Sequence, residues 1–317
     1  GVGLPIISHE SGQRCIYPNF EEIKNFTGPV QARNFEVFRE LLDKNHMLDQ
    51  AHDFFRASGA LTAIEYKDVI EAQLRTYLKG GFQLLSLNDF TGQGYAPVGI
   101  LDTFWNSKGL ITPEKWREFC APTVALLRFD KRAFYNDEVF EGKAEIYNYG
   151  PSVLKNAKIS WSITDSEGKT LKSGKLKTQT IGKNGVFPLG NFSFALGNIT
   201  EPQKLTVHLS VALVKNSWDI WVYPRHNNQM QSTDKILYTT VFDEKAKQYL
   251  ADGKKVVLCP KPSNVKGRKS VFHNHFWNPI MFKWPPMTIG CLIHSDQPVF
   301  DHFITSYHTD WQWWDIL

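Results

Sequence analysis

A glutamate near the start of the chain, Glu10, has the sequence context of a chemically active carboxylate. The apolar run at residues 4–7 predicts a short, fully buried strand, and it gives way at once to Ser-His-Glu-Ser-Gly. In α/β barrels, the carboxyl ends of the strands form the face that carries the chemistry, so Glu10 is a candidate for such a role. The alternative is a carboxylate that caps a neighbouring element or is solvated at the end of a strand.

The elements that would position Glu10 follow from the spacing of apolar residues. The predicted order is the strand at 4–7, helices at 35–45 and 49–76 with a break near Ser58-Gly59, a buried strand at 82–87 and a closing helix at 113–119. This amounts to about a quarter of a (β/α)8 barrel, which needs eight strands and about 250 residues. We therefore expect residues 1–126 to be the C-terminal part of a barrel whose other strands come from another piece of polypeptide.

Four segments resemble a known family. Pro-Ile-Ile-Ser-His-Glu-Ser-Gly at residues 5–12 resembles the seventh strand of the glycoside hydrolase family 2 catalytic domain, the β-galactosidase and β-glucuronidase type. Gly-Phe-Gln-Leu-Leu-Ser-Leu-Asn-Asp-Phe at 81–90 resembles the eighth strand, and residues 101–119 resemble the segment that closes the barrel. Asn-Ser-Trp-Asp-Ile-Trp-Val-Tyr-Pro at 216–224 is similar to a strand ending of multidomain hydrolases from gut bacteria.

The resemblance implies roles for particular residues. Glu10 would be the nucleophile of a retaining mechanism, whereas His9 departs from the residue types expected before it and could bind the sugar, bond to Glu10 or be a satisfied buried histidine. Asn88 and Asp89 would contact sugar at the end of the eighth strand, unless Asp-Phe-Thr-Gly is simply a turn that begins at Asp89. Trp105 would stack on a sugar ring or be buried against the closing helix.

A retaining hydrolase also needs an acid/base carboxyl group. In the family this glutamate follows an asparagine at the end of the fourth strand, and this chain contains no Asn-Glu pair. We expect the chain by itself to be inactive and to depend on the missing N-terminal part of the same protein. The alternatives are a non-catalytic carbohydrate-binding or scaffolding protein, and a degenerate hydrolase that has lost its acid/base residue.

Two further domains are predicted downstream. Alternating strands separated by turns over residues 127–230 are typical of an immunoglobulin-like β-sandwich. Residues 231–317 begin with a strand, a helix capped by Asp243 and a second strand, which is the start of a parallel sheet and predicts an incomplete α/β domain. The predicted fold class is therefore multidomain α/β plus all-β, with a partial (β/α)8 barrel.

Composition excludes several classes of function. The chain has 317 residues and a net charge of +4 without a basic block, so no nucleic acid partner is expected. No apolar run is long enough to span a membrane. Neither a Gly-rich phosphate loop nor a metal-type spacing of Cys and His occurs, so we expect no cofactor and no metal. The resemblance implies a carbohydrate substrate and a periplasmic or extracellular location in a bacterium.

Overall fold

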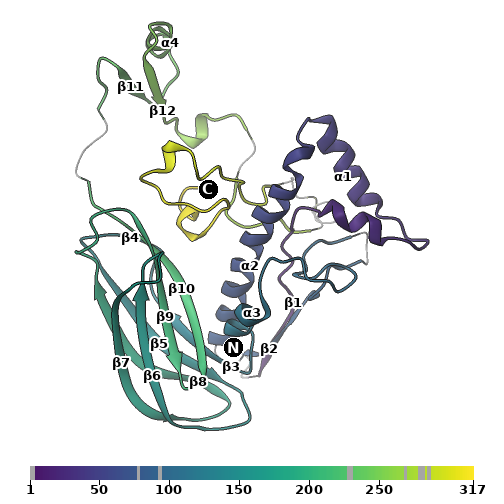
Figure 1. Cartoon of the computed structure of the whole chain (residues 1–317), viewed down its shortest axis with the longest axis vertical. Coiled ribbons are helices and arrows are strands. Elements are labelled where there is room, and N and C mark those ends of the chain that lie inside the picture. The colour runs from purple at the N-terminus through teal and green to yellow at the C-terminus, as the bar shows by residue number, and fades with distance from the viewer. Residues whose placement is uncertain are drawn as a thin grey trace. The chain divides into compact units, whose positions relative to one another are not determined.

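The computed structural model describes residues 4–76, 79–91, 95–226, 231–267, 270–277, 283 and 287–317. The chain forms two compact units (Figure 1), of which the larger combines Gly1–Pro224 with Ser270–Leu317 and the smaller is Arg225–Lys269. These units divide the chain elsewhere than the domain boundaries predicted at residues 126 and 230, because the C-terminal segment packs with the N-terminal part of the chain.

The strand that carries Glu10 pairs with one other strand. β1 (Ile6–Ser11) and β2 (Lys79–Leu84) form a two-stranded parallel sheet, and no barrel is present among the described residues. The prediction of a fully buried strand is wrong, since Ile6 is 56% and Ile7 61% exposed. Their branched side chains suit a covered strand, but the part of the chain that the structure describes places no third strand or layer over them.

Helical segments connect these two strands and follow them in the chain. They are the 3₁₀ turns η1 (Phe20–Asn25) and η2 (Leu48–Gln50) and the α-helices α1 (Arg33–Lys44), α2 (Ala51–Arg75) and α3 (Pro113–Phe119). The break expected near Ser58-Gly59 does not occur, because tertiary contacts use both residues. The Ser58 hydroxyl donates to the Phe54 carbonyl and accepts from the Tyr17 amide, and Gly59 leaves room for the side chain of Leu110.

The sandwich is built from two facing sheets. One has three strands in the order β3 (Thr123–Arg128), β5 (Val139–Asn148), β8 (Gly185–Ala195), and the other has five in the order β4 (Ala133–Tyr135), β10 (Val214–Tyr223), β9 (Gln203–Val211), β6 (Leu154–Thr164), β7 (Thr170–Ile181). All neighbours are antiparallel except the short β4–β10 pair. Inward residues of both sheets, among them Trp161 and Phe140, form one core, as the alternating sequence predicts.

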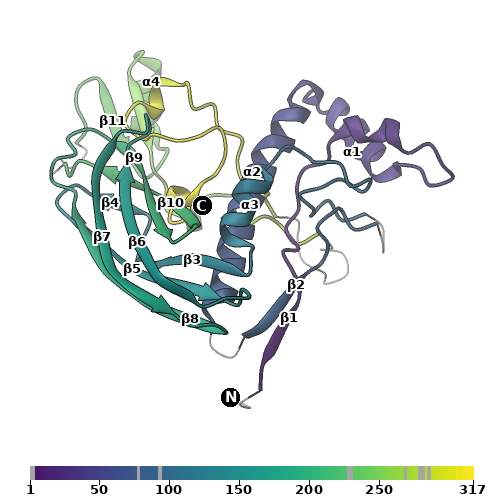
Figure 2. The same ribbon diagram turned by 60° about the horizontal axis from the view of Figure 1, so that its bottom comes forward.

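Helix α2 joins the sandwich to the β1–β2 sheet. Figures 1 and 2 both show it running between them. A second apolar cluster holds this arrangement, with Tyr66 and Ile70 of α2 packed against Phe119 of α3 and Leu126 of β3. One helix therefore has the sandwich on one side and the Glu10 strand on the other.

The smaller unit contains the predicted strand–helix–strand. β11 (Ile236–Thr239) and β12 (Lys255–Leu258) are parallel and are joined by α4 (Glu244–Ala251), whose first turn is capped by the Asp243 carboxylate accepting from the Ala246 amide. After β12, the described residues form three short 3₁₀ turns. η3 (Pro262–Asn264) belongs to the smaller unit, and η4 (Pro298–Phe300) and η5 (Trp311–Trp313) belong to the larger.

Candidate functional site

Glu10 lies in an irregularity of β1 rather than after its end. Ser8 pairs with Phe82 and Ser11 with Leu84, so β1 has one more residue than β2 between these pairs, which is a β-bulge. Glu10 has a φ of 52°, a left-handed conformation that is uncommon for a residue other than glycine. Bulges and left-handed residues of this kind cluster next to active sites, where they redirect a side chain.

The Glu10 carboxylate has one firm hydrogen-bond donor. Gln13 Nε2 donates to Glu10 Oε2 at 3.1 Å and to the Glu10 carbonyl at 3.0 Å. His9 Nε2 lies 4.0 Å from Glu10 Oε1, with 69% of the His9 side chain and 51% of the Glu10 side chain exposed. His9 is therefore not a buried histidine, and one carboxylate oxygen of Glu10 remains open to a ligand.

A segment far along the chain supports the Glu10 turn. Trp277 Nε1 donates to Gln13 Oε1 at 2.7 Å, which fixes the amide that holds Glu10. The Cys15 amide donates to the His275 carbonyl at 2.9 Å. Sequence reasoning missed both Gln13 and this segment. The proximity of Gln13 to Glu10 was a usable signal, whereas nothing in the sequence relates Gln13 to Trp277.

Gly12 is required by the same turn. Its φ is 81°, and a Cβ atom there would lie 2.1 Å from Tyr66 Cε1. The Tyr66 hydroxyl also lies 2.8 Å from the carbonyls of Gly12 and Val98. Tyr66 thus ties the turn after Glu10 to α2 and to the loop that follows β2.

The loop after β2 holds Asn88 and Asp89, and the structure uses Asp89 inside the protein. Asp89 is 1% exposed, and its carboxylate accepts from Lys108 Nζ at 2.6 Å, from the Tyr95 hydroxyl at 2.9 Å and from the Gly99 amide at 2.9 Å. These contacts favour the structural interpretation of Asp89 over a contact with sugar. The turn predicted to begin there extends to Gly92, which lies outside the described residues.

Asn88 and Trp105 have different surroundings. Asn88 is half-buried, with Oδ1 accepting from the Ser86 hydroxyl at 2.5 Å and Nδ2 donating to the Asp89 carbonyl. Trp105 has a φ of 68° and is 65% exposed, so it is not buried against the closing helix α3. No contact given by the structure joins either residue to Glu10.

A buried carboxyl group lies beside this loop. The Tyr95 hydroxyl oxygen lies 3.2 Å from Glu22 Oε2, and burial, opposed by Lys108 and reinforced by Asp89 and Asp102, raises the pKa of Glu22 to about 7. Lys108, which is paired with Asp89, opposes this rise, but burial has the larger effect. Glu22 was not singled out from the sequence, where it is one of two adjacent glutamates.

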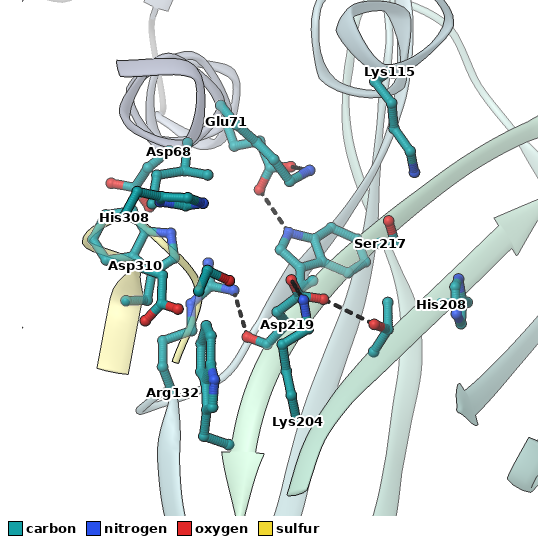
Figure 3. Close-up of a pocket in the computed structure, with 17 residues that line it drawn as sticks. Asp68, Glu71, Lys115, Arg132, Lys204, His208, Ser217, Asp219, His308 and Asp310 are labelled. Atoms are coloured by element: carbon teal, nitrogen blue, oxygen red, sulfur yellow. Dashed lines mark hydrogen bonds and ion pairs between the residues drawn. The ribbon is translucent and has the colours of Figure 1, made fainter. Parts of the chain in front are cut away.

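A cavity lies on the other side of α2, within the larger unit (Figure 3). Its volume is about 460 Å³, and its walls come from α2, the outer face of the five-stranded sheet and the C-terminal segment. The charged residues that line it are Lys67, Asp68, Glu71, Lys115, Arg132, Lys204, Asp219 and Asp310. Sequence reasoning missed this cavity because its walls lie on elements far apart in the chain.

The described residues show neither a metal site nor a membrane-spanning helix. Among the described residues, no group of three or more His, Cys, Asp or Glu side chains is arranged to hold a metal ion. Across the same part of the chain, no helix combines the length and the apolar character that a membrane crossing requires.

Comparison with known proteins gives two matches to family models. Residues 138–224 match a domain of unknown function, DUF8488, and residues 237–317 match another, DUF8487. Comparison with curated proteins gives no significant match.

Solved structures share limited similarity with the chain. The DNA glycosylase AlkC of Pseudomonas fluorescens is 17% identical over 32% of this chain and 30% of its own, with a TM-score of 0.27. The CARDB domain of a Pyrococcus furiosus protein is 12% identical over 32% of this chain and 94% of its own, with a TM-score of 0.26. The β-glucuronidase of Parabacteroides merdae is 17% identical over 32% of this chain and 13% of its own, with a TM-score of 0.24.

Proposed function

We propose that this chain contributes the nucleophile, Glu10, of a retaining glycoside hydrolase of the β-galactosidase and β-glucuronidase type. The observation that carries the proposal is the local geometry of Glu10, in a bulge at the carboxyl end of a parallel strand, with a left-handed backbone. A strained residue that aims a half-exposed carboxylate away from its strand is expected where a carboxylate must meet a ligand. The sequence resemblance of residues 5–12 supports the same role.

The proposed reaction has two steps. An oxygen of the Glu10 carboxylate attacks the anomeric carbon, the bond from that carbon to the leaving oxygen breaks, and the leaving oxygen takes a proton from the acid. Water then attacks the glycosyl ester, loses a proton to the same group, now a base, and releases Glu10 as a carboxylate. Gln13 would hold Oε2 during both steps and leave Oε1 free to attack.

The second carboxyl group must come from elsewhere. A retaining mechanism places the two carboxyl groups about 5–5.5 Å apart. The contacts of Glu10 in the described residues involve His9 and Gln13 and no other carboxylate. We propose that another part of the polypeptide supplies the acid/base group, in a bacterial protein that acts in the periplasm or outside the cell. His9, Asn88 and Trp105 are the proposed sugar contacts.

Covalent trapping tests this function directly. The intact protein is incubated with 2-deoxy-2-fluoro glycosyl fluorides of galactose, glucuronic acid and glucose, because fluoride leaves without protonation by an acid. We expect one sugar to add its mass to the peptide that contains Glu10, and no addition in Glu10→Gln. Glu21→Gln, which changes an exposed glutamate, is the matched control and should label normally. Labelling at another carboxylate, or equal labelling of Glu10→Gln, contradicts the proposal.

The second candidate is a carbohydrate-binding protein without turnover. The exposed Trp105 favours it, because an exposed aromatic face can stack on a sugar ring without any catalytic group. Sugar binding that is lost in Trp105→Ala and retained in Glu10→Gln, together with the absence of covalent labelling, would support this alternative.

A further inference from the structure

The cavity beside α2 is separate from the Glu10 site. Its lining residues come from α2, α3, β9, β10, the β3–β4 connection and the segment from Ser306 to Trp311, and none of them contacts Glu10. Its volume of about 460 Å³ lies within the usual 300–1,000 Å³ of small-molecule sites. The site is therefore large enough for a small organic ligand.

Most charges on its walls already have partners. Lys67 Nζ contacts Glu71 Oε1 at 2.5 Å, and Trp218 Nε1 donates to Glu71 Oε2 at 2.9 Å. Lys204 Nζ pairs with Asp219 Oδ2 at 3.1 Å, and Lys115 Nζ pairs with Glu118 Oε1 at 2.9 Å. Asp310 Oδ1 accepts from the Gln312 amide at 3.2 Å. The opposite charges within each pair neutralise one another, so these groups have few donors or acceptors left for a ligand.

Two charged groups have hydrogen-bonding capacity that no contact among the described residues uses. Asp68 has no hydrogen bond or ion pair within the described residues, and it faces the cavity from the exposed side of α2. The Arg132 guanidinium lies 4.7 Å from the Phe129 ring and 5.4 Å from the Trp311 ring, and Nη1 donates to the Asp219 carbonyl at 3.0 Å. Aromatic contacts fix the plane of this group, while its remaining N–H donors have no acceptor of opposite charge among the described residues.

The charge on the walls is balanced. Four cationic groups and four acidic groups line the cavity, and they are Lys67, Lys115, Arg132, Lys204, Asp68, Glu71, Asp219 and Asp310. Burial lowers the pKa of His208 and His308, so both are neutral at pH 7. An anionic ligand would meet the free carboxylate of Asp68, and a cationic ligand would meet the guanidinium of Arg132. Each ion would also be attracted by the group of opposite charge, so the walls select neither sign and suit a neutral ligand that both donates and accepts hydrogen bonds.

We propose that this cavity binds a neutral saccharide, whose hydroxyl groups donate to Asp68 and accept from Arg132. A sugar hydroxyl has both capacities, and neighbouring hydroxyls can serve a carboxylate and a guanidinium together. Trp311, which is half-buried, lines the same cavity and supplies apolar surface for the C–H groups of the ring. The proposal does not depend on a catalytic role for Glu10.

Calorimetric titration of the full chain tests the site. The neutral probes are methyl β-glucoside, methyl β-galactoside, cellobiose and lactose, and the charged probes are inorganic phosphate and glucosamine. We expect at least one neutral probe to bind, and Asp68→Ala to weaken it about 10- to 100-fold, as expected for the loss of hydrogen bonds to a charged acceptor. Asp53→Ala, an exposed residue on the same helix, should leave the affinity unchanged.

A second variant keeps the test independent of Asp68. Ser306→Phe places a ring in the cavity from the C-terminal segment and should abolish binding, with the melting temperature measured to confirm that the variant folds. Glu10→Gln should bind the probe as the unchanged chain does. The proposal is overturned if no neutral probe binds at millimolar concentration, if only phosphate or glucosamine binds, or if Asp68→Ala and Ser306→Phe bind normally. Loss of binding in Glu10→Gln alone would place the sugar at the Glu10 site instead.

Discussion

Replacing Glu22 by glutamine should stabilise the protein at alkaline pH and not at acidic pH. Glu22 is 4% exposed, and its pKa rises from 4.5 to about 7 because burial disfavours the carboxylate. The folded chain thus holds a proton that the unfolded chain releases above pH 4.5, and stability falls as pH rises through this window. At 1.36 kcal/mol per pH unit, the rise from 4.5 to about 7 corresponds to a loss of about 3 kcal/mol above pH 7.

Glutamine removes this loss because it never ionises, and its amide N–H can donate to the Tyr95 hydroxyl oxygen in place of the protonated carboxyl group. Thermal melts at pH 5 and pH 8 provide the measurement. We expect Glu22→Gln to melt several degrees higher than the unchanged chain at pH 8 and within about 1 °C of it at pH 5. The neighbouring exposed change Glu21→Gln should not alter the pH dependence. A variant that is less stable at pH 8 would refute the reasoning, since it would mean that Glu22 is ionised and stabilised by Lys108.

Three further changes test the contacts around α2 and Glu10. Glu71→Ala should cost about 3–5 kcal/mol in urea unfolding, because it leaves buried cations and an indole donor without their acceptor, and an unchanged midpoint would contradict this. Gly12→Ala should lower the melting temperature by the equivalent of more than about 1 kcal/mol because of the positive φ and the contact with Tyr66, whereas Gly28→Ala, where nothing lies within 4 Å, should be neutral. Gln13→Ala should slow the covalent labelling of Glu10 about tenfold while leaving the melting temperature nearly unchanged; a normal labelling rate would remove Gln13 from the proposed role.

Local patterns in the sequence predicted several elements of the secondary structure, although they also predicted a break near Ser58-Gly59 that α2 does not have. The alternation of apolar residues predicted the sandwich strands, and the helix at 113–119 was placed at its observed bounds, Pro113–Phe119. The strand–helix–strand around Asp243 was likewise confirmed. These features depend on residues a few positions apart, where period and capping chemistry act directly.

Which residues are buried, and which side chains pair with one another, depended on contacts between residues distant in the chain. The sequence predicted a buried β1, yet Ile6 and Ile7 are exposed, because burial depends on the layers that surround a strand and not on its composition. Asp89 was predicted to face a ligand, but Lys108, 19 residues further along, pairs with it inside the protein. Such a pairing follows from the path of the intervening loop.

The sequence alone predicted a strand near Glu10 and a long helical segment at residues 49–76, and both form, with Glu10 inside β1 rather than after it. Only the tertiary structure decided how Glu10 is held, because its donor Gln13 is fixed by Trp277, 264 residues away from it in the chain. It also decided that Asp68 and Arg132 line one cavity. Periodicity carries information over a few turns or strands, whereas a site assembled from several elements is defined by packing, which no local pattern encodes.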